Sequence, residues 1–221
     1  DGTFDCNSGE SSGIFDGADN QTTISLWYRA DDFGNDNIQM LFEEGGGSNG
    51  LNMYIYNSKI HAGAWSTSNS WDGNWLITDT TEHTWHNAVL IFNDATNTMT
   101  FYHDGVKIGD QTNIIENTGT DEDGLGATAD ATRCSTTTSY TFIQCSEDAA
   151  DAFFKGRLDE FRVTTTALSD HYVITSYNTQ NTGTWHPTLN ENVNHFTSEG
   201  IHLSETLSFT DTTTGVEVAT E

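Results

Sequence analysis

The sequence predicts an all-β fold built as a sandwich of two antiparallel sheets. Apolar residues alternate with polar ones over most of the chain, turn-forming residues separate these segments, and threonine is abundant. Alternation buries one face of a strand and leaves the other polar, and β-branched residues suit that pleated surface. Short strands at intervals of about eight to twelve residues are typical of two packed sheets.

The predicted elements follow from this alternation in chain order. Strands are expected at residues 22–29, 38–43, 51–56, 59–65, 85–92, 98–103, 140–144 and 153–164. Loops rich in Gly, Asn and Asp separate them, notably 45–50 and 93–97. Residues 111–139 read as a long polar insertion, and loops of that length are usually functional or mobile. The one predicted helix covers residues 167–177.

The composition changes after Gln180, which divides the chain into an N-terminal strand or arm at 1–12, a main domain at 13–180 and a C-terminal extension at 181–221. Within the extension, apolar residues alternate with polar ones over 201–209, and these are Ile201, Leu203, Leu207 and Phe209. This pattern predicts a strand with one face for burial. The strand either joins its own sandwich or completes a sheet of another copy, and head-to-tail repetition of the second contact gives a filament.

The strongly negative net charge limits the kinds of partner that the protein can bind. Seven Lys and Arg against 33 Asp and Glu give a formal net charge of −26. Binding to nucleic acid or to anionic membranes needs clustered positive charge, so both are excluded. The aromatic content argues against disorder. No stretch is long and apolar enough to insert into a membrane, and the chain begins at Asp1, so we expect a mature secreted protein in a saline or calcium-containing medium.

The three cysteines lack the spacing of a zinc or thioredoxin site. In a secreted chain, Cys134 and Cys145 are expected to form a disulfide that closes a short loop. Cys6 then pairs with another chain, is buried as a small apolar residue, or replaces one of the other two as partner. The sequence also contains one N-glycosylation sequon, at Asn20.

Three segments, in order, resemble one known family. The first is "IFDG" at 14–17 followed by "TISLWYR" at 23–29. The second is the pair "TWHNAVLIF" at 84–92 and "MTFYHDG" at 99–105. The third is "FKGRLDEFRV" at 154–163 with "ALS" at 167–169. Together they are similar to the concanavalin A-like, laminin-G-like (LamG-like) jelly-roll domains of prokaryotic secreted and cell-surface proteins. His103 stands where an apolar residue is more usual in that family.

The resemblance implies a two-sheet antiparallel jelly roll that binds ligands, often glycans, and commonly holds a structural calcium ion. By position in the motifs, the ion would be held by Asp16 and Asp159. A second candidate is the acidic turn with Asp121 and Asp123, because calcium prefers oxygen ligands. The alternative for both is a solvated acidic turn.

A glycan site needs an aromatic platform beside polar groups. Trp65, Trp71 and Trp75 flank the polar residues Asn69 and Asp72, which together predict such a site. The competing interpretation is that at least two of these indoles belong to the core.

No catalytic motif is present. The E-x-D-x-x-E run of related glycosidases does not occur, and Asp159 and Glu160 are adjacent in a strand, so their side chains face opposite ways. His83 and His86 are expected to diverge. We therefore expect a non-enzymatic extracellular protein that assembles with copies of itself, or with other surface proteins, into a filament or layer. The alternative is a calcium-dependent carbohydrate-binding or adhesion module.

Overall fold

The structure is a computed structural model. It describes residues 6–7, 21–34, 37–45, 48–66, 71–112, 114, 123–128, 132–135, 143–146 and 152–181. Residues 1–177 form one compact unit. Among the described residues no helix is long and apolar enough to cross a membrane.

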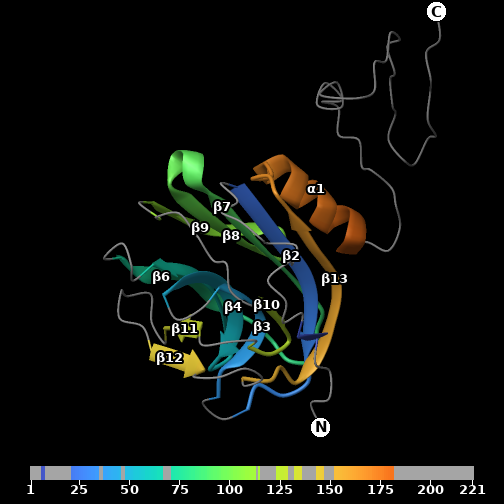
Figure 1. Ribbon diagram of the computed structural model, residues 1–221. Coiled ribbons are helices and arrows are strands. Elements are labelled where there is room, and N and C mark those ends of the chain that lie inside the picture. Colours follow the sequence, from blue (N-terminus) through green and yellow to red (C-terminus); the bar gives the residue numbers. More distant parts are fainter. Residues whose placement is uncertain are drawn as a thin grey trace, which may run out of the picture. The chain divides into compact units, whose positions relative to one another are not determined.

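Two large antiparallel sheets form the sandwich of this unit, and β11 (Thr132–Cys134) and β12 (Ile143–Ser146) form a separate two-stranded sheet (Figure 1). The six-stranded sheet has the order β1-β10-β3-β4-β5-β6. Its strands are β1 (Cys6–Asn7), β3 (Gln39–Gly45), β4 (Asn49–Tyr56), β5 (Lys59–Ser66), β6 (Trp71–Asp79) and β10 (Asp123–Leu125). The five-stranded sheet has the order β13-β2-β7-β8-β9. Its strands are β2 (Gln21–Ala30), β7 (His86–Asn93), β8 (Thr98–His103), β9 (Val106–Thr112) and β13 (Gly156–Thr164), and the short 3-10 helix η1 (Asp94–Thr96) links β7 to β8.

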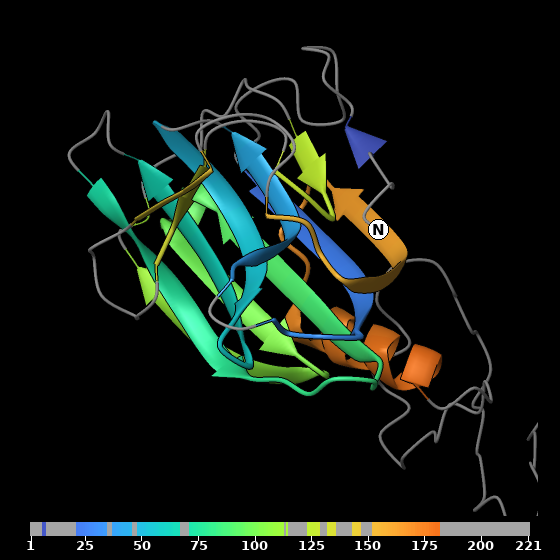
Figure 2. The same cartoon turned by 90° about the horizontal axis from the view of Figure 1, so that it is seen from below.

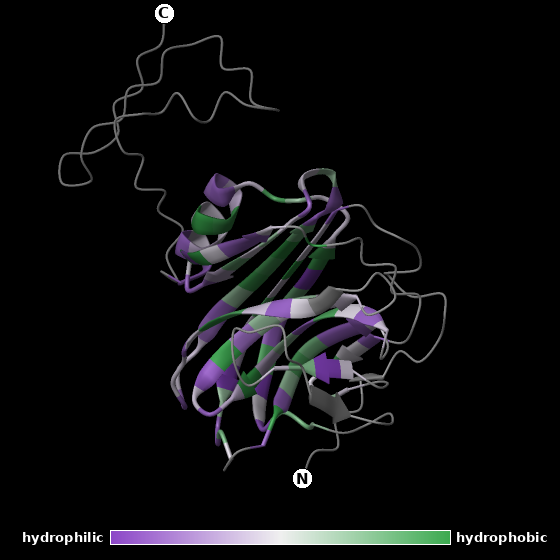
Figure 3. Cartoon of the chain, turned by 90° about the vertical axis from the view of Figure 1, so that its left-hand side faces the viewer, coloured by the Kyte–Doolittle hydropathy of each residue, from purple (hydrophilic) through white to green (hydrophobic). Residues whose placement is uncertain are grey.

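The core lies between the two sheets because alternate residues of facing strands are apolar. In β2 these are Ile24, Leu26 and Tyr28, all fully buried. They pack in one cluster with residues such as Leu90 of β7 and Met53 of β4. Hydrophobic and hydrophilic residues alternate along the strands in Figure 3. The all-β sandwich predicted from this alternation is therefore confirmed.

Each sheet also has its outer face partly covered. Helix α1 (Asp170–Asn181) lies against the five-stranded sheet, where Val173 packs with Val89, Ile91 and Tyr102 (Figure 2). On the six-stranded sheet, the Tyr54 hydroxyl donates to the carbonyl of Ser135. Ser135 follows β11, which pairs with β12. Tyr54 also packs there in a second apolar cluster with Met40, Trp65, Trp75 and Cys134.

Several predicted boundaries need correction. The helix begins at Asp170 rather than at 167, and the strand expected at 140–144 is β12 at Ile143–Ser146. The segment 111–139 is not a plain insertion, because it contains β10 and β11. β6 and β9 were missed altogether, since glycine and asparagine interrupt β6 and polar residues dominate β9. The division at 1–12, 13–180 and 181–221 stays a prediction.

Candidate functional site

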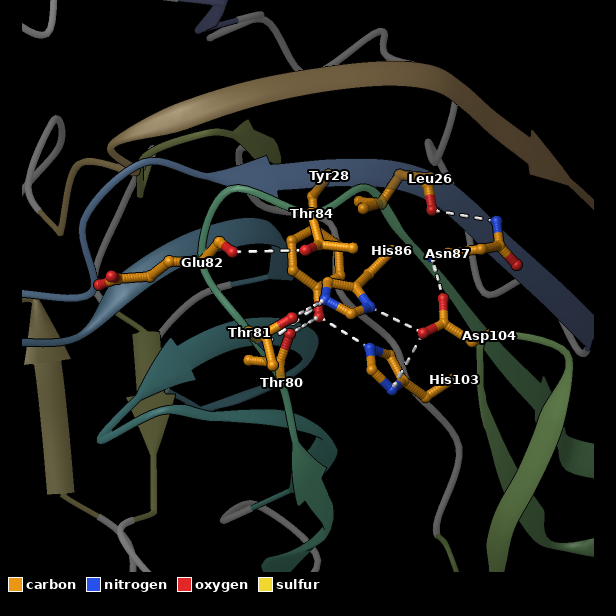
Figure 4. A network of polar contacts seen from close by, with 10 residues as sticks. All are labelled: Leu26, Tyr28, Thr80, Thr81, Glu82, Thr84, His86, Asn87, His103 and Asp104. Atoms are coloured by element: carbon orange, nitrogen blue, oxygen red, sulfur yellow. Dashed lines mark hydrogen bonds and ion pairs between the residues drawn. The ribbon is translucent and has the colours of Figure 1, made fainter. Parts of the chain in front are cut away.

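A cluster of two histidines and an aspartate lies at one end of the sandwich (Figure 4). His86 begins β7, and His103 ends the neighbouring antiparallel strand β8, so the two residues meet at the same end of the sheet. Each histidine lies two positions from a core residue of its own strand and therefore on the same face of that strand: His86 with Ala88, and His103 with Phe101. Both imidazoles therefore point inward, and both residues are 8% exposed.

The aspartate of the cluster is fixed by a tight turn. Asp104 and Gly105 connect β8 to β9, with φ angles of 50° and 71°. Asp-Gly at positive φ is the preferred pair for a two-residue hairpin turn. The Asn87 N–H donates to Asp104 Oδ1 over 2.8 Å, and Asp104 Oδ2 lies 2.7 Å from His86 Nδ1. Both carboxylate oxygens are thus held in place.

The other ring nitrogens also have polar neighbours. Nε2 of His86 lies 2.8 Å from Oγ1 of Thr81. Nε2 of His103 lies 2.8 Å from the hydroxyl of Tyr28, which in turn lies 2.6 Å from Oγ1 of Thr80. The rings of His86 and His103 stack with their centroids 5.0 Å apart.

Burial and hydrogen bonding together set the pKa values of the cluster. Burial lowers the pKa of His103 to about 4, although the nearby Asp104 charge acts in the opposite direction. Burial also raises the pKa of Tyr28. For Asp104, burial favours the neutral form, but hydrogen bonds from His86 and Asn87 outweigh it and the pKa is lowered. At neutral pH the cluster thus combines an ionised carboxylate with a neutral His103.

Next to this cluster, the outer face of the five-stranded sheet carries a rim patch, defined here as Trp85, Arg29 and Arg157. Arg29 and Arg157 are paired directly across β2 and β13. His86 pairs with Tyr28 in antiparallel register. Trp85 precedes His86 and Arg29 follows Tyr28, so Trp85 and Arg29 lie next to each other just beyond this pair. Trp85 is 40% exposed, and the Arg29 Nε donates to the His83 carbonyl over 3.1 Å. An exposed indole therefore lies beside guanidinium groups.

The predicted tryptophan platform is wrong for two of its three indoles. Trp65 and Trp75 are 1% and 0% exposed. They pack with Met40, Tyr54 and Cys134 on the outer face of the six-stranded sheet. The competing interpretation, that at least two of them are core residues, is the one that the structure supports. Trp71 and Asp72 lie in β6, but their side chains, like Asn69, are outside the described residues.

The two predicted calcium sites are only partly described. Asp159 is exposed in β13, and its Oδ1 accepts the Glu160 N–H over 2.8 Å, whereas Asp16 lies outside the described residues. Asp123 lies in β10 directly opposite Glu44 of β3, while Asp121 is not described. Burial raises the pKa of Asp123 to about 7, and its Oδ1 has no hydrogen-bond partner among the described residues. Such an oxygen suits a hard cation, so a calcium ligand at Asp123 stays a prediction.

Other predicted features are not tested by the described part of the chain. β11 and β12 are paired, so the strands that carry Cys134 and Cys145 are neighbours, but the side chain of Cys145 is not described. Their disulfide stays a prediction. The sequon residue Asn20 and the strand predicted at 201–209, with Ile201, Leu203, Leu207 and Phe209, also lie outside the described residues.

The sequence did not predict that His86, His103 and Asp104 form a cluster. It did give one signal: His103 replaces an apolar residue next to the Asp-Gly turn. The expected divergence of His83 and His86 is confirmed, since their side chains are 62% and 10% exposed.

Comparison with known proteins agrees with this architecture. Residues 7–174 match the Laminin_G_3 family, described as the Concanavalin A-like lectin/glucanases superfamily, and the chain belongs to this superfamily. No curated protein matches the sequence.

Solved structures with the same fold share little sequence with the chain. The CBM40 domain of a Ruminococcus gnavus IT-sialidase, bound to α2,3-sialyllactose, is 18% identical with a TM-score of 0.52, over 72% of this chain and 83% of that one. Domain 4 of AbnA, an extracellular GH43 arabinanase from Geobacillus stearothermophilus in complex with arabinotriose, is 16% identical with a TM-score of 0.50, over 71% and 66%.

The receptor-binding domain of botulinum neurotoxin D is 15% identical with a TM-score of 0.55, over 76% of this chain but only 39% of that one. These likenesses concern the fold.

Proposed function

We propose that this chain is a non-catalytic, extracellular carbohydrate-binding domain, and that its rim patch contacts the sugar. The observation that carries the proposal is that Trp85, Arg29 and Arg157 are neighbours: Arg29 and Arg157 pair across β2 and β13, and Trp85 directly precedes the β7 residue that pairs with Tyr28. Support comes from two domains of the same fold that were solved with an oligosaccharide, sialyllactose in one and arabinotriose in the other.

The chemistry of the patch suits a sugar. An indole offers a flat apolar surface to the C–H groups of a pyranose or furanose ring, and its exposure has a solvation cost unless a ligand covers it. Guanidinium groups donate in a planar fork to hydroxyl or carboxylate oxygens. Arg29 Nη1 donates to Asp31 Oδ1 over 2.5 Å, so the charge of Arg29 is offset there, and the exposed Arg157 is the guanidinium of this pair that a sugar reaches most easily.

The proposal of a non-catalytic role rests on the absence of a catalytic motif from the sequence. The superfamily includes glucanases, but the E-x-D-x-x-E run of related glycosidases is absent here. Asp159 and Glu160 are adjacent in β13, and the Arg162 guanidinium binds the Glu160 carboxylate. Neither acid is therefore placed as one of a catalytic pair.

The test is a glycan array with the full chain, followed by calorimetry with each glycan that binds. The array should include α2,3-sialyllactose and arabino-oligosaccharides, with calcium and with chelator. Trp85→Ala should weaken binding at least tenfold, and Arg157→Ala should weaken it several-fold. The matched control is Tyr172→Ala, which removes an aromatic residue that is 56% exposed but lies in α1, outside the rim patch. Binding that survives Trp85→Ala, or an array without hits, contradicts the proposal.

Filament assembly was the first expectation from the sequence, and it depends on residues 201–209. Those residues lie outside the described chain, and no structural observation favours assembly over sugar binding. Dependence of binding on calcium likewise stays a prediction, to be read from the chelator arm of the same experiment.

A further inference from the structure

We propose that His86, His103 and Asp104 form a binding site for a divalent transition metal such as Zn²⁺. One ligand atom from each residue, His86 Nδ1, His103 Nδ1 and Asp104 Oδ2, would hold the ion. All three side chains can offer ligand atoms within 4.8 Å of one another. This site is separate from the rim patch, and the inference does not depend on sugar binding.

The distances suit a tetrahedral ion. Zinc binds imidazole nitrogen and carboxylate oxygen at about 2.1 Å, which places two ligand atoms of a tetrahedron about 3.4 Å apart. Asp104 Oδ2 lies 2.7 Å from His86 Nδ1 and 4.0 Å from His103 Nδ1, so the observed separations lie on either side of this value.

The surroundings of the three residues also match a metal site. A histidine that binds metal through one nitrogen usually donates its other N–H to an oxygen, which fixes the ring. Here Nε2 of His86 lies beside Oγ1 of Thr81, and Nε2 of His103 lies beside the Tyr28 hydroxyl, each at 2.8 Å (Figure 4). The Asn87 N–H holds the second oxygen of Asp104. Each of the three proposed ligands is thus oriented by a hydrogen-bonding group that would not itself bind the ion.

The chemical type of the three ligand atoms determines which metal ions the site favours. Two imidazole nitrogens and one carboxylate suit zinc, nickel or cobalt, whereas calcium prefers a shell of oxygens. The Asp104 side chain is 30% exposed, so an ion can enter from solvent on that side. Three protein ligands leave a fourth position for water.

Metal binding must change the tautomer of His86. Without metal, Nδ1–H of His86 donates to Asp104, and Nε2 faces both the hydroxyl and, at 3.4 Å, the backbone N–H of Thr81. With metal, the ion replaces the Nδ1 proton, Nε2 carries the ring proton and donates it to the Thr81 hydroxyl. Coordination of His103 requires the tautomer in which Nε2–H donates to Tyr28.

The test is calorimetry with ZnCl₂ on the full chain after removal of metal by chelator. We expect one strong site. His103→Leu and Asp104→Asn should each weaken that site at least tenfold, and Tyr28→Phe should weaken it about tenfold through loss of ring orientation. His83→Ala is the matched control, because His83 is exposed and outside the cluster. Every variant keeps the histidines of the C-terminal extension, so binding there is common to all.

The variants are compared only where circular dichroism shows the wild-type fold. Asp104→Asn keeps a residue that suits the positive φ of the turn, so it remains available if His103→Leu does not fold. Long-range ¹H–¹⁵N spectra of the imidazoles provide a second readout, in which zinc should shift the Nδ1 resonances of His86 and His103. Absence of zinc binding, equal binding by all variants, or unchanged Nδ1 resonances would overturn the proposal.

Discussion

The indole Nε1 of Trp75 donates a hydrogen bond of 3.0 Å to Oδ1 of Asn52, although their strands, β6 and β4, are separated by β5. The residue between them in the register is Gly63, which pairs with Asn52 on one side and with Trp75 on the other. Because Gly63 has no side chain, the indole crosses over β5 to reach the amide. This contact explains why Trp75 is a core residue.

Gly63→Ala should therefore destabilise the fold. A Cβ at this position would lie 2.1 Å from Cδ1 of Trp75, which the rigid indole cannot avoid without moving. We expect a loss of about 2 to 3 kcal/mol in the free energy of unfolding, measured in urea. The control is Gly109→Ala, whose Cβ meets only a flexible Leu76 methyl at 3.1 Å, and it should change stability by less than about 1 kcal/mol. Equal effects would contradict the packing argument.

The contact of Trp75 with Asn52 across Gly63 shows which parts of the fold the sequence could predict. Alternation within one segment identified β2, β4, β5, β7 and β8 closely, since it reports which face of a strand is buried. It did not identify β6, where "WDGNW" reads as a turn. The burial of Trp75 depends on Gly63 and Asn52, and no local pattern reports a pairing between strands so far apart.

The histidine cluster was missed for a related reason. His86 and Asp104 lie at the ends of two strands, and only the antiparallel pairing of β7 with β8 brings them together. The motif resemblance supplied the strands and the Asp-Gly turn, but the inward direction of His103 follows from its phase with Phe101. Knowledge of register would have been sufficient to find the cluster.

Tyr28→Phe should lower stability through the hydroxyl that links His103 and Thr80. Its removal leaves Nε2 of His103 and Oγ1 of Thr80 without their shared partner in a buried site. We expect a loss of about 1 to 3 kcal/mol in the free energy of unfolding. Tyr172→Phe, on the exposed face of α1, should change it by no more than about 0.5 kcal/mol. If both variants unfold at the same urea concentration as the wild type, the hydroxyl contributes nothing.

Acid should destabilise the protein partly through His61. This residue is 1% exposed and stacks on Tyr54, with ring centroids 4.8 Å apart. Burial lowers the pKa of His61 to about 4; the backbone near Tyr56 and Ser135 opposes this shift, but neither ring nitrogen has a well-formed hydrogen bond to any described residue. Between about pH 6.5 and pH 4 the unfolded chain binds a proton that the folded chain does not. Stability is therefore complete above about pH 6.5 and falls as the pH is lowered, by up to about 1.4 kcal/mol per pH unit.

His61→Phe keeps the stack on Tyr54 and removes the titrating group, so it should flatten this decline. The slope should fall by about half, because burial lowers the pKa of His103 by a similar amount. Urea unfolding at several pH values between 7.5 and 4 measures the slope. His83→Gln, at an exposed position, should leave it unchanged. A wild-type slope in His61→Phe would show that His61 is charged in the folded protein.

Asp123→Asn should stabilise the protein at pH 8 in the absence of calcium. Burial raises the pKa of Asp123 to about 7, and the paired residue across the strands is Glu44. The folded chain thus holds a proton between about pH 4 and pH 7 that the unfolded chain releases, and stability falls as the pH rises through this range. Asparagine removes the charge, and because the site is partly exposed we expect a gain of only about 1 kcal/mol at pH 8.

Calcium tests whether the same carboxylate is a ligand, as the acidic turn predicts. In chelator, Asp123→Asn should be the more stable protein by urea unfolding. In millimolar calcium, a wild type that uses Asp123 as a ligand gains stability that the variant does not, so the order of the two proteins reverses. Asp79→Asn is the control, since the Asp79 side chain is 85% exposed at the end of β6. If calcium stabilises all three proteins equally, its site does not include Asp123.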